Sequence, residues 1–271
     1  MQNELHIRRL YRPVQPTVRQ AGDSVYYREM APDKKLDNLI HCYWELRTAE
    51  KLSSPFVYRV VADGCIDIFF ELSHPSENFV MGFCKQYTEF PLQGKFHYIG
   101  IRFFPTSFPS LFKINAKELS NRFERLELVV KEASDFIANS FSEKDDSLSV
   151  CNKLDSYFLQ KLGKTGMSID NRFAEAFSAI LENQGAVSVQ KDLDIGLSPR
   201  QLRRYFEFYV GDSAKTFSQV VRFQHILHAR PSAQSLKQNK IYYDLGYFDQ
   251  AHFIKEFKNF YGLTPGKAFE G

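Results

Sequence analysis

The sequence predicts an α+β fold, in which a β-rich N-terminal domain with flanking helices precedes an all-α C-terminal domain. Residues 56–104 contain short runs of β-branched and aromatic residues, such as FVYRVV and HYIGIRFF, separated by turn-forming dipeptides. From Ile169 onward, apolar residues recur at helical spacing. A short helix, a glycine turn and a second helix occur twice in this part, which predicts two helix-turn-helix units joined by a linker helix.

The length of the chain indicates two domains, because 271 residues exceed the usual size of one small domain. The short polar segment GKTG, residues 163–166, predicts a linker between them. We therefore expect a β-rich domain over residues 1–165 and a helical domain over residues 166–271.

A turn signal lies inside the β region at Asp63-Gly64, because Gly64 adopts a positive φ at no steric cost. We predict a hairpin with Val60 and Ile66 on its two arms. Further along, residues 150–162 carry an amphipathic stripe. Such a helix packs either on its own domain or against a second copy of the chain, so a homodimer stays open.

Composition excludes several classes of protein. The chain has 44% hydrophobic and 25% charged residues, no apolar run of about 18 residues and no apolar signal segment, which predicts a cytoplasmic protein without a membrane span. No CxxC pair occurs, so we expect neither a metal nor another cofactor and four reduced thiols: Cys42, Cys65, Cys84 and Cys151. The net charge of +3 does not by itself indicate a nucleic-acid partner.

The first helical unit centres on LSPRQLRR, residues 197–204. After a turn at Gly196, Ser198 is the predicted N-cap and Pro199 the first helical residue. The two predicted faces are an apolar one with Leu202, Tyr205, Phe206 and Tyr209, and a polar one with Arg200, Arg203, Arg204 and Glu207. A polar face is usually just solvated, but arginine after such a turn has the planar fork that binds guanine or phosphate.

The same pattern recurs downstream. A turn at Gly246 precedes a helix capped by Asp249. Its predicted buried side holds Phe253, Phe257 and Phe260, and its exposed side holds His252, Lys255 and Asn259. Between the units, residues 213–229 predict a linker helix on the order of 20 Å long, which suits two helices in successive major grooves.

The segments GLSPRQLRRYFEFYVGDSAKTFSQVVRFQHIL and DLGYFDQAHFIKEFKNFYGLTP together resemble the paired helix-turn-helix DNA-binding domain of the AraC family of bacterial transcription regulators, over residues 169–271. The resemblance implies double-stranded DNA as a partner, RNA polymerase as a second partner by family analogy, and no catalysis. The residues expected to bind DNA are Ser198, Arg200, Arg203, Arg204, Gln250, His252, Lys255 and Asn259.

Two positions depart from the family pattern. Family members usually carry a small alanine four residues before each turn glycine, where this chain has Asp192 and Tyr242. Larger side chains crowd a close contact between helices. Since the segment leading to the first turn is also short, we hypothesise that the first unit binds DNA more weakly than the second.

Residues 36–128 are similar to a poorly characterised, sensor-like domain often found ahead of such DNA-binding domains, through VVADGCIDIFFEL and YIGIRFFPTSFPSLFKI. That pattern typically begins Pro-Asp-Gly, and this chain has Ala62-Asp63-Gly64 instead. The resemblance implies a domain that senses a small-molecule effector or a partner, and the residues do not identify which.

Three alternatives stay open beside a transcription regulator without enzymatic activity. A DNA-alkyl-transfer repair enzyme needs a tight group of zinc-bound thiolates, which the cysteine spacing does not offer. A metal sensor would gather His74, Cys84 and His97 with Cys65. An interaction protein with weak or lost DNA binding would follow if the two departures disrupt the helix-turn-helix units.

Overall fold

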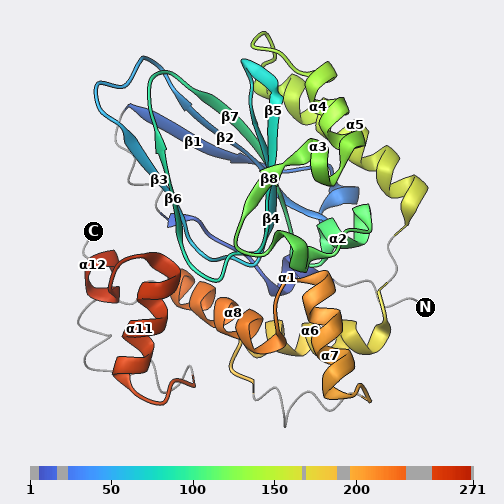
Figure 1. Ribbon diagram of the computed structural model, residues 1–271, viewed down its shortest axis with the longest axis vertical. Coiled ribbons are helices and arrows are strands. Elements are labelled where there is room, and N and C mark those ends of the chain that lie inside the picture. Colours follow the sequence, from blue (N-terminus) through green and yellow to red (C-terminus); the bar gives the residue numbers. More distant parts are fainter. Residues whose placement is uncertain (1–5, 17–23, 167–168, 188–195, 230–245, 270–271) are drawn as a thin grey trace.

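The computed structural model describes residues 6–16, 24–166, 169–187, 196–229 and 246–269. A β-rich part lies above a helical part in Figure 1. The predicted fold class is confirmed: within the described ranges every strand lies between residues 25 and 125, and the regular structure after residue 169 is helical.

The larger sheet is antiparallel, with six strands in the order β1-β2-β7-β4-β5-β8. These strands are β1 (Val25–Met30), β2 (Ile40–Thr48), β4 (Ile66–Glu71), β5 (His74–Met81), β7 (His97–Phe103) and β8 (Phe123–Arg125). The remaining strands, β3 (Phe56–Val60) and β6 (Thr88–Leu92), pair with each other as a separate ribbon. Strand β2 was not predicted because it is buried on both faces and therefore lacks polar–apolar alternation.

The predicted hairpin at Asp63-Gly64 is wrong, although Gly64 has the expected positive φ of 73°. Val60 ends β3 in the ribbon and Ile66 begins β4 in the sheet, so this turn carries the chain from one to the other. The Asp63 carboxylate accepts a hydrogen bond from the Cys65 amide at 2.9 Å. This local bond forms the turn without requiring the flanking strands to pair.

Helices cover one face of the sheet (Figure 1). They are α2 (Ser107–Phe112), α3 (Leu126–Val129), α4 (Lys131–Ser140) and α5 (Ser147–Thr165), with 3-10 turns η2 (Lys34–Leu36) and η3 (Ala116–Leu119). Helix α5 buries Val150, Leu154 and Phe158 in the core of this same part of the chain. The linker predicted at residues 163–166 is wrong, because α5 continues through Thr165 and only Gly166 leaves the helix.

The helical part contains α6 (Asn171–Glu182), α7 (Pro199–Tyr209), α8 (Ala214–Ala229), α11 (Gln250–Tyr261) and α12 (Pro265–Phe269). Its core includes Phe177, Phe206 and Phe217. The N-terminal segment, with α1 (Ile7–Leu10), packs its apolar side chains into this core, while Arg8 donates hydrogen bonds to carbonyls of β2. The N-terminal residues that join the core of the helical part are Ile7, Tyr11, Val61, Ala62, Phe83 and Phe104. The two parts therefore meet in this one cluster, while the sheet and its helices have a separate core.

We predict that Gly100→Ala destabilises the protein. Gly100 lies opposite Trp44 in the β2–β7 pair, and a Cβ at this position would lie 1.9 Å from Cε2 of the indole. The ring must move, which costs about 1–3 kcal/mol of unfolding free energy. Urea unfolding followed by tryptophan fluorescence measures this loss.

The matched control is Gly163→Ala in α5, where an added Cβ meets nothing within 4 Å. This change is expected to stabilise the helix by roughly 0.5–1 kcal/mol. Equal effects of the two substitutions would contradict the packing argument.

Candidate nucleic-acid interface

The first predicted recognition helix, α7, begins where the sequence indicates. The Ser198 hydroxyl accepts a hydrogen bond from the Gln201 amide at 3.3 Å, and the Gln201 side chain accepts one from the Ser198 amide at 3.0 Å. This capping box satisfies two amides that a helix otherwise leaves unpaired, and Pro199 has no amide hydrogen to satisfy. Local chemistry therefore defines the first turn.

Helix α7 has the two faces expected. The apolar face has Leu202 and Phe206 buried and Tyr205 and Tyr209 half-buried, and the polar face exposes Arg200, Arg203 and Arg204. Arg203 donates to Glu207 at 2.9 Å while its side chain stays 72% exposed. Within the described ranges, no ion pair engages Arg200 or Arg204. Two of the three guanidinium groups are thus exposed and have no ion-pair partner among the described residues.

Glu207 also contacts the N-terminal part of the chain. Its carboxylate lies 2.9 Å from the Lys117 ammonium of η3, so it holds Lys117 and Arg203 at the same time. Hydrogen bonds from Lys117 and then Arg203 lower the pKa of Glu207 below its ordinary value. The negative charge of Glu207 therefore lies among the basic side chains of the predicted DNA-binding face.

The second predicted recognition helix, α11, begins at Asp249, which accepts a hydrogen bond from the His252 amide at 2.7 Å. Its buried side chains are Phe253, Phe257 and Phe260, as predicted, and its exposed ones include Gln250, His252 and Lys255. Asn259 is also exposed, but its amide donates to the Lys85 carbonyl at 2.7 Å. Asn259 therefore contacts the N-terminal part of the chain.

Each helix-turn-helix turn is held by an arginine that the sequence analysis missed. Arg172 donates to the carbonyl of Gly196, and Arg222 to that of Gly246, both at 3.3 Å and both 24 residues apart. The two glycines have φ of 71° and 77°. The repeated Arg-to-Gly spacing is the signal in the sequence that could have revealed this pair.

The linker helix α8 connects the two units and is anchored to α11. Its 16 residues span about 24 Å. The Arg222 guanidinium lies 4.3 Å from the ring centre of Tyr247 and 3.6 Å from Glu256 of α11. Gln219 donates to Glu256 at 2.6 Å. These contacts hold α11 against α8 and limit independent movement of the second unit.

The comparison with family models agrees with this geometry. Residues 194–271 match a model described as a helix-turn-helix domain, which spans α7, α8 and α11. The C-terminal part of the chain therefore carries the helix-turn-helix domain that the sequence predicts. Residues 28–125 match a second model, described as a domain of unknown function (DUF6597), which covers the strands from within β1 to β8. The similarities noted for both parts of the sequence are thus confirmed.

Solved structures similar to this chain include ToxT from Vibrio cholerae. A 1.65 Å structure of ToxT is 11% identical, covers 91% of this chain and 98% of its own, and gives a TM-score of 0.44. A ToxT structure bound to (E)-4-(8-methylnaphthalen-1-yl)but-3-enoic acid is 12% identical, with the same coverage and a TM-score of 0.43. No curated protein sequence matches the chain.

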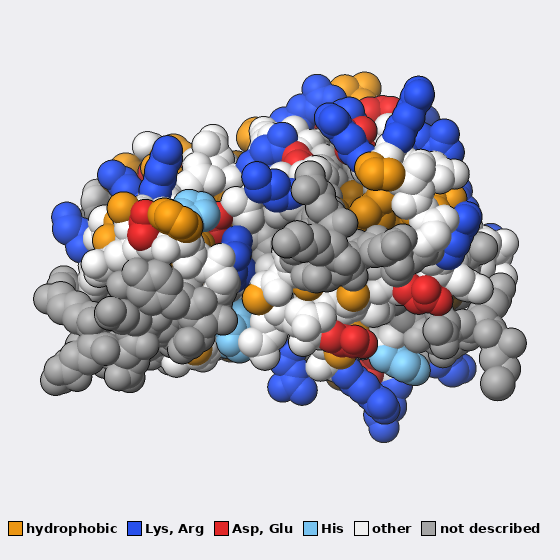
Figure 2. Space-filling model, turned by 90° about the horizontal axis from the view of Figure 1, so that it is seen from below, with side chains coloured by type: hydrophobic (Ala, Val, Ile, Leu, Met, Phe, Trp, Pro, Cys, Tyr) orange, Lys and Arg blue, Asp and Glu red, His pale blue; other side chains and the backbone are white. Residues whose placement is uncertain are grey.

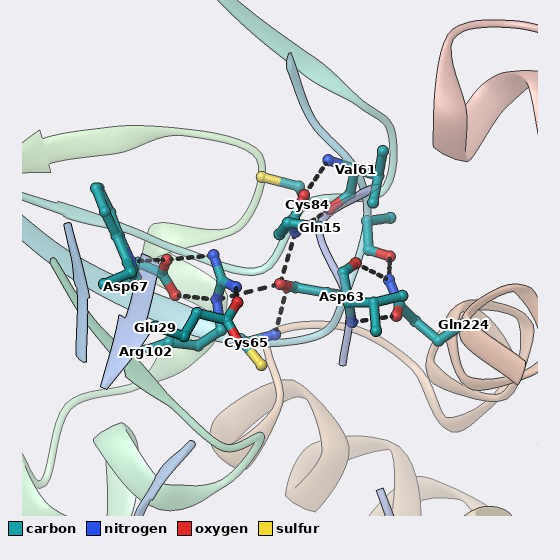
Figure 3. Close-up of polar contacts among 12 residues, drawn as sticks. Gln15, Glu29, Val61, Asp63, Cys65, Asp67, Cys84, Arg102 and Gln224 are labelled. Atoms are coloured by element: carbon teal, nitrogen blue, oxygen red, sulfur yellow. Dashed lines mark hydrogen bonds and ion pairs between the residues drawn. The ribbon is translucent and has the colours of Figure 1, made fainter. Parts of the chain in front are cut away.

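A buried polar cluster lies where the two parts of the chain meet (Figure 3). Arg102, whose side chain is 1% exposed, lies 2.9 Å from Asp67 and 3.5 Å from Asp63. Burial raises the pKa of Asp67, and the Arg102 charge opposes that shift. Gln15 donates to the Asp63 carboxylate at 2.8 Å. Sequence analysis missed this cluster because its members come from three separate stretches of the sequence.

The linker helix reaches the same turn. Gln224 of α8, which is 1% exposed, donates to the Ala62 carbonyl at 2.8 Å and accepts from the Val14 amide at 2.8 Å. Tyr11 donates its hydroxyl to the Asp63 carbonyl at 2.7 Å. The turn at residues 61–64 is therefore bonded to the sheet, to the N-terminal segment and to α8.

The metal sensor considered for this chain is not favoured. His97 bonds Glu45 at 2.6 Å and the Cys84 thiol donates to the Gly82 carbonyl at 3.4 Å, so these two proposed ligands have other partners. Among the residues that the structure describes, the group spaced to hold a metal is instead Glu29, His41 and Cys42. Arg102 lies 3.9 Å from Glu29, and its positive charge disfavours a cation there.

Three other predictions from the sequence concern the departures from the family pattern, the cysteines and a membrane span. Asp192 and Tyr242, the departures from the family pattern, lie outside the described residues. The four cysteines are free thiols, and burial raises the pKa of Cys65 and Cys84. Within the described residues, no helix combines the length and apolar character needed to cross a membrane.

We predict that Glu207→Gln strengthens DNA binding. The substitution removes a negative charge beside Arg203 and releases that guanidinium, so affinity should rise several-fold and the slope of log affinity against log salt should steepen by about 1. Fluorescence anisotropy with a duplex selected from random sequence measures both. Glu175→Gln, an exposed change on α6, is the control, and an equal rise there would contradict the local explanation.

We predict that Arg102→Met destabilises the fold by about 3–5 kcal/mol, because Asp63 and Asp67 then lose their buried partner. Chemical denaturation measures the loss. The control, Arg125→Met, breaks an ion pair between Arg125 and Glu127, whose side chains are 55% and 52% exposed. It should lower the free energy of unfolding by no more than about 1 kcal/mol. Similar losses in both variants would show that the buried cluster is unimportant for stability.

Proposed function

We propose that this protein regulates transcription by placing α7 and α11 in successive major grooves of double-stranded DNA. One observation carries the proposal: both helices bury an aromatic face against α8 and expose a polar, largely basic face. Helix α8 is about 24 Å long, and successive major grooves on one side of a duplex repeat every ~34 Å. A rigid linker of this size suits two helices that insert side by side.

The proposed roles follow from the position of each side chain. Arg200 and Arg204 contact base edges or phosphates through their exposed guanidinium groups, and Arg203 joins them when its ion pair with Glu207 breaks. Gln250, His252 and Lys255 do the same from α11. The Ser198 hydroxyl is committed to the helix cap, so Ser198 contributes by directing the first amides of α7 toward a phosphate. Asn259 holds α11 against the N-terminal part of the chain, and it is free to contact DNA only when its hydrogen bond to the Lys85 carbonyl breaks.

The distribution of charge supports binding through these two faces and not through a general field. Figure 2 views the end of the molecule that carries the helical part, where Lys and Arg side chains stand at several places rather than in one continuous patch. The whole chain carries a net charge of only +3. Affinity should therefore depend on a few side chains, and each one should matter.

Further partners follow from the family and not from contacts in the fold. We propose that the β-rich part senses a small-molecule effector, that DNA-bound protein contacts RNA polymerase, and that the protein acts in the cytoplasm. The apolar stripe of α5 is buried within its own part of the chain, so it offers no support for a homodimer. Light scattering at micromolar concentration tests the oligomeric state.

We predict that Arg200→Ala and Arg203→Ala each weaken binding to a selected duplex by about 5- to 150-fold and relax its sequence preference, as the loss of a base contact requires. Lys255→Ala should weaken binding to all sequences alike and reduce the salt slope by about 1. Anisotropy titrations over a salt series measure both effects. Lys131→Ala, at a side chain 75% exposed on α4, is the control.

The proposal is refuted if the wild-type protein selects no duplex, or if Lys131→Ala loses as much affinity as the arginine variants. Equal losses for Arg203→Ala and Lys255→Ala at one salt concentration would contradict the hypothesis that the first unit binds more weakly.

A further inference from the structure

A cavity of about 140 Å³ lies between the six-stranded sheet and the β3–β6 ribbon. Its walls are mainly aromatic and aliphatic, with side chains from both layers: Trp44, Tyr58, Phe69, Phe79, Met81 and Phe90. An engineered apolar cavity of roughly 150 Å³ holds one benzene molecule. The volume therefore suits a single aromatic ring with a short substituent.

The polar groups of this cavity favour an uncharged occupant. Its lining includes Asp63 and Asp67, whose carboxylate oxygens already accept hydrogen bonds from Gln15, the Cys65 amide, Trp44 and Arg102. The Cys65 and Cys84 thiols also line it, and burial keeps them neutral by raising their pKa. An ionic ligand would leave water without gaining an unpaired counter-charge.

The segment that follows β5, residues 82–87, runs from the cavity wall to the DNA-binding helices. Gly82 and Cys84 line the cavity. Lys85 forms an ion pair with Asp212, just beyond the end of α7, at 2.6 Å. The Lys85 carbonyl accepts the Asn259 amide of α11 at 2.7 Å, and the Tyr87 amide donates to the Asn259 carbonyl at 3.1 Å. One short segment thus contacts the ends of both recognition helices.

Glycines at the two helix ends let this segment approach the backbone. Gly211 follows α7 and Gly262 follows α11, 51 residues apart, with φ of 106° and 93°. A Cβ on Gly211 would lie 3.0 Å from Cβ of Phe83, and one on Gly262 would lie 3.0 Å from Cδ2 of Tyr87. Tyr87 directly precedes β6 of the ribbon, so the residue that packs on the end of α11 is joined directly to a strand beside the cavity.

We propose that a small, uncharged aromatic molecule binds this cavity and, by displacing residues 82–87, changes the spacing of α7 and α11 and hence the affinity for DNA. The DNA part of this inference rests on the proposed function, whereas the binding and the coupling do not. A ligand shifts the arrangement only by as much as it binds one arrangement better than the other.

Ligand binding is tested with toluene, and with benzoate and benzylammonium as charged analogues. Trp44 lines the cavity and is the one tryptophan in the chain, so its fluorescence reports occupancy. Toluene should give a saturable change in emission and the charged analogues none. Val60→Phe, which fills the cavity from β3, should abolish the response. No response to toluene, a stronger response to a charged analogue, or an unchanged response in Val60→Phe would overturn the assignment.

Coupling is tested by hydrogen exchange, which needs no DNA. The Gly211 amide bonds the Phe206 carbonyl at 3.0 Å and the Gly262 amide bonds the Lys258 carbonyl at 2.9 Å, so both report the helix ends. Toluene should change the exchange rate of both in the full chain. In Tyr87→Ala, toluene should still alter Trp44 emission while the response at Gly262 disappears. An unchanged exchange rate in the wild type would overturn the coupling.

The final arm measures DNA affinity with and without toluene, and we expect a change of about fivefold or more in the wild type and a smaller one in Tyr87→Ala. Val57→Ala, at an exposed position on β3, is the control that should behave like the wild type. If no duplex binds at all, the proposed function fails and the exchange experiment still decides the coupling. If DNA binds with an affinity that toluene does not alter, the inference fails alone.

Discussion

The structure depends on the burial of Arg102 between Asp63 and Asp67. A guanidinium stays charged even when it is 1% exposed, so its burial requires carboxylates beside it, and this requirement constrains the turn that carries Asp63. The same turn bonds Gln15 from the N-terminal segment and Gln224 from α8. One electrostatic constraint inside the β-rich part thereby determines where the DNA-binding part sits.

This arrangement makes the two parts of the chain mechanically continuous. The N-terminal segment reaches the core of the helical part, and residues 82–87 contact the ends of α7 and α11. The repeated Arg172 and Arg222 bonds fix each turn from within the helical part. The internal repeat therefore defines the shape of each unit, whereas contacts with the β-rich part fix both helix ends.

The sequence was informative where structure is determined locally. The cap at Ser198, the positive φ of Gly64 and the buried side of α11 each depend on a few adjacent residues. Strand β2 and the fate of the Asp63-Gly64 turn depend on pairing between distant segments, which no local pattern encodes. The exposure of the candidate DNA-binding residues was predictable because it follows helical periodicity. The cavity was not, because its walls come from strands that only the sheet brings together.

The shared core has a consequence for dissecting the chain. Phe177 and Phe217 stack at 5.0 Å between ring centres, and Tyr11 lies 6.5 Å from Phe217 in the same cluster. Cutting the polypeptide after residue 165 would remove Tyr11 and Phe104 from this cluster and expose an apolar surface to water. A fragment containing only the helical part would tend to self-associate through this surface. DNA binding measured on such a fragment would therefore differ from that of the full chain.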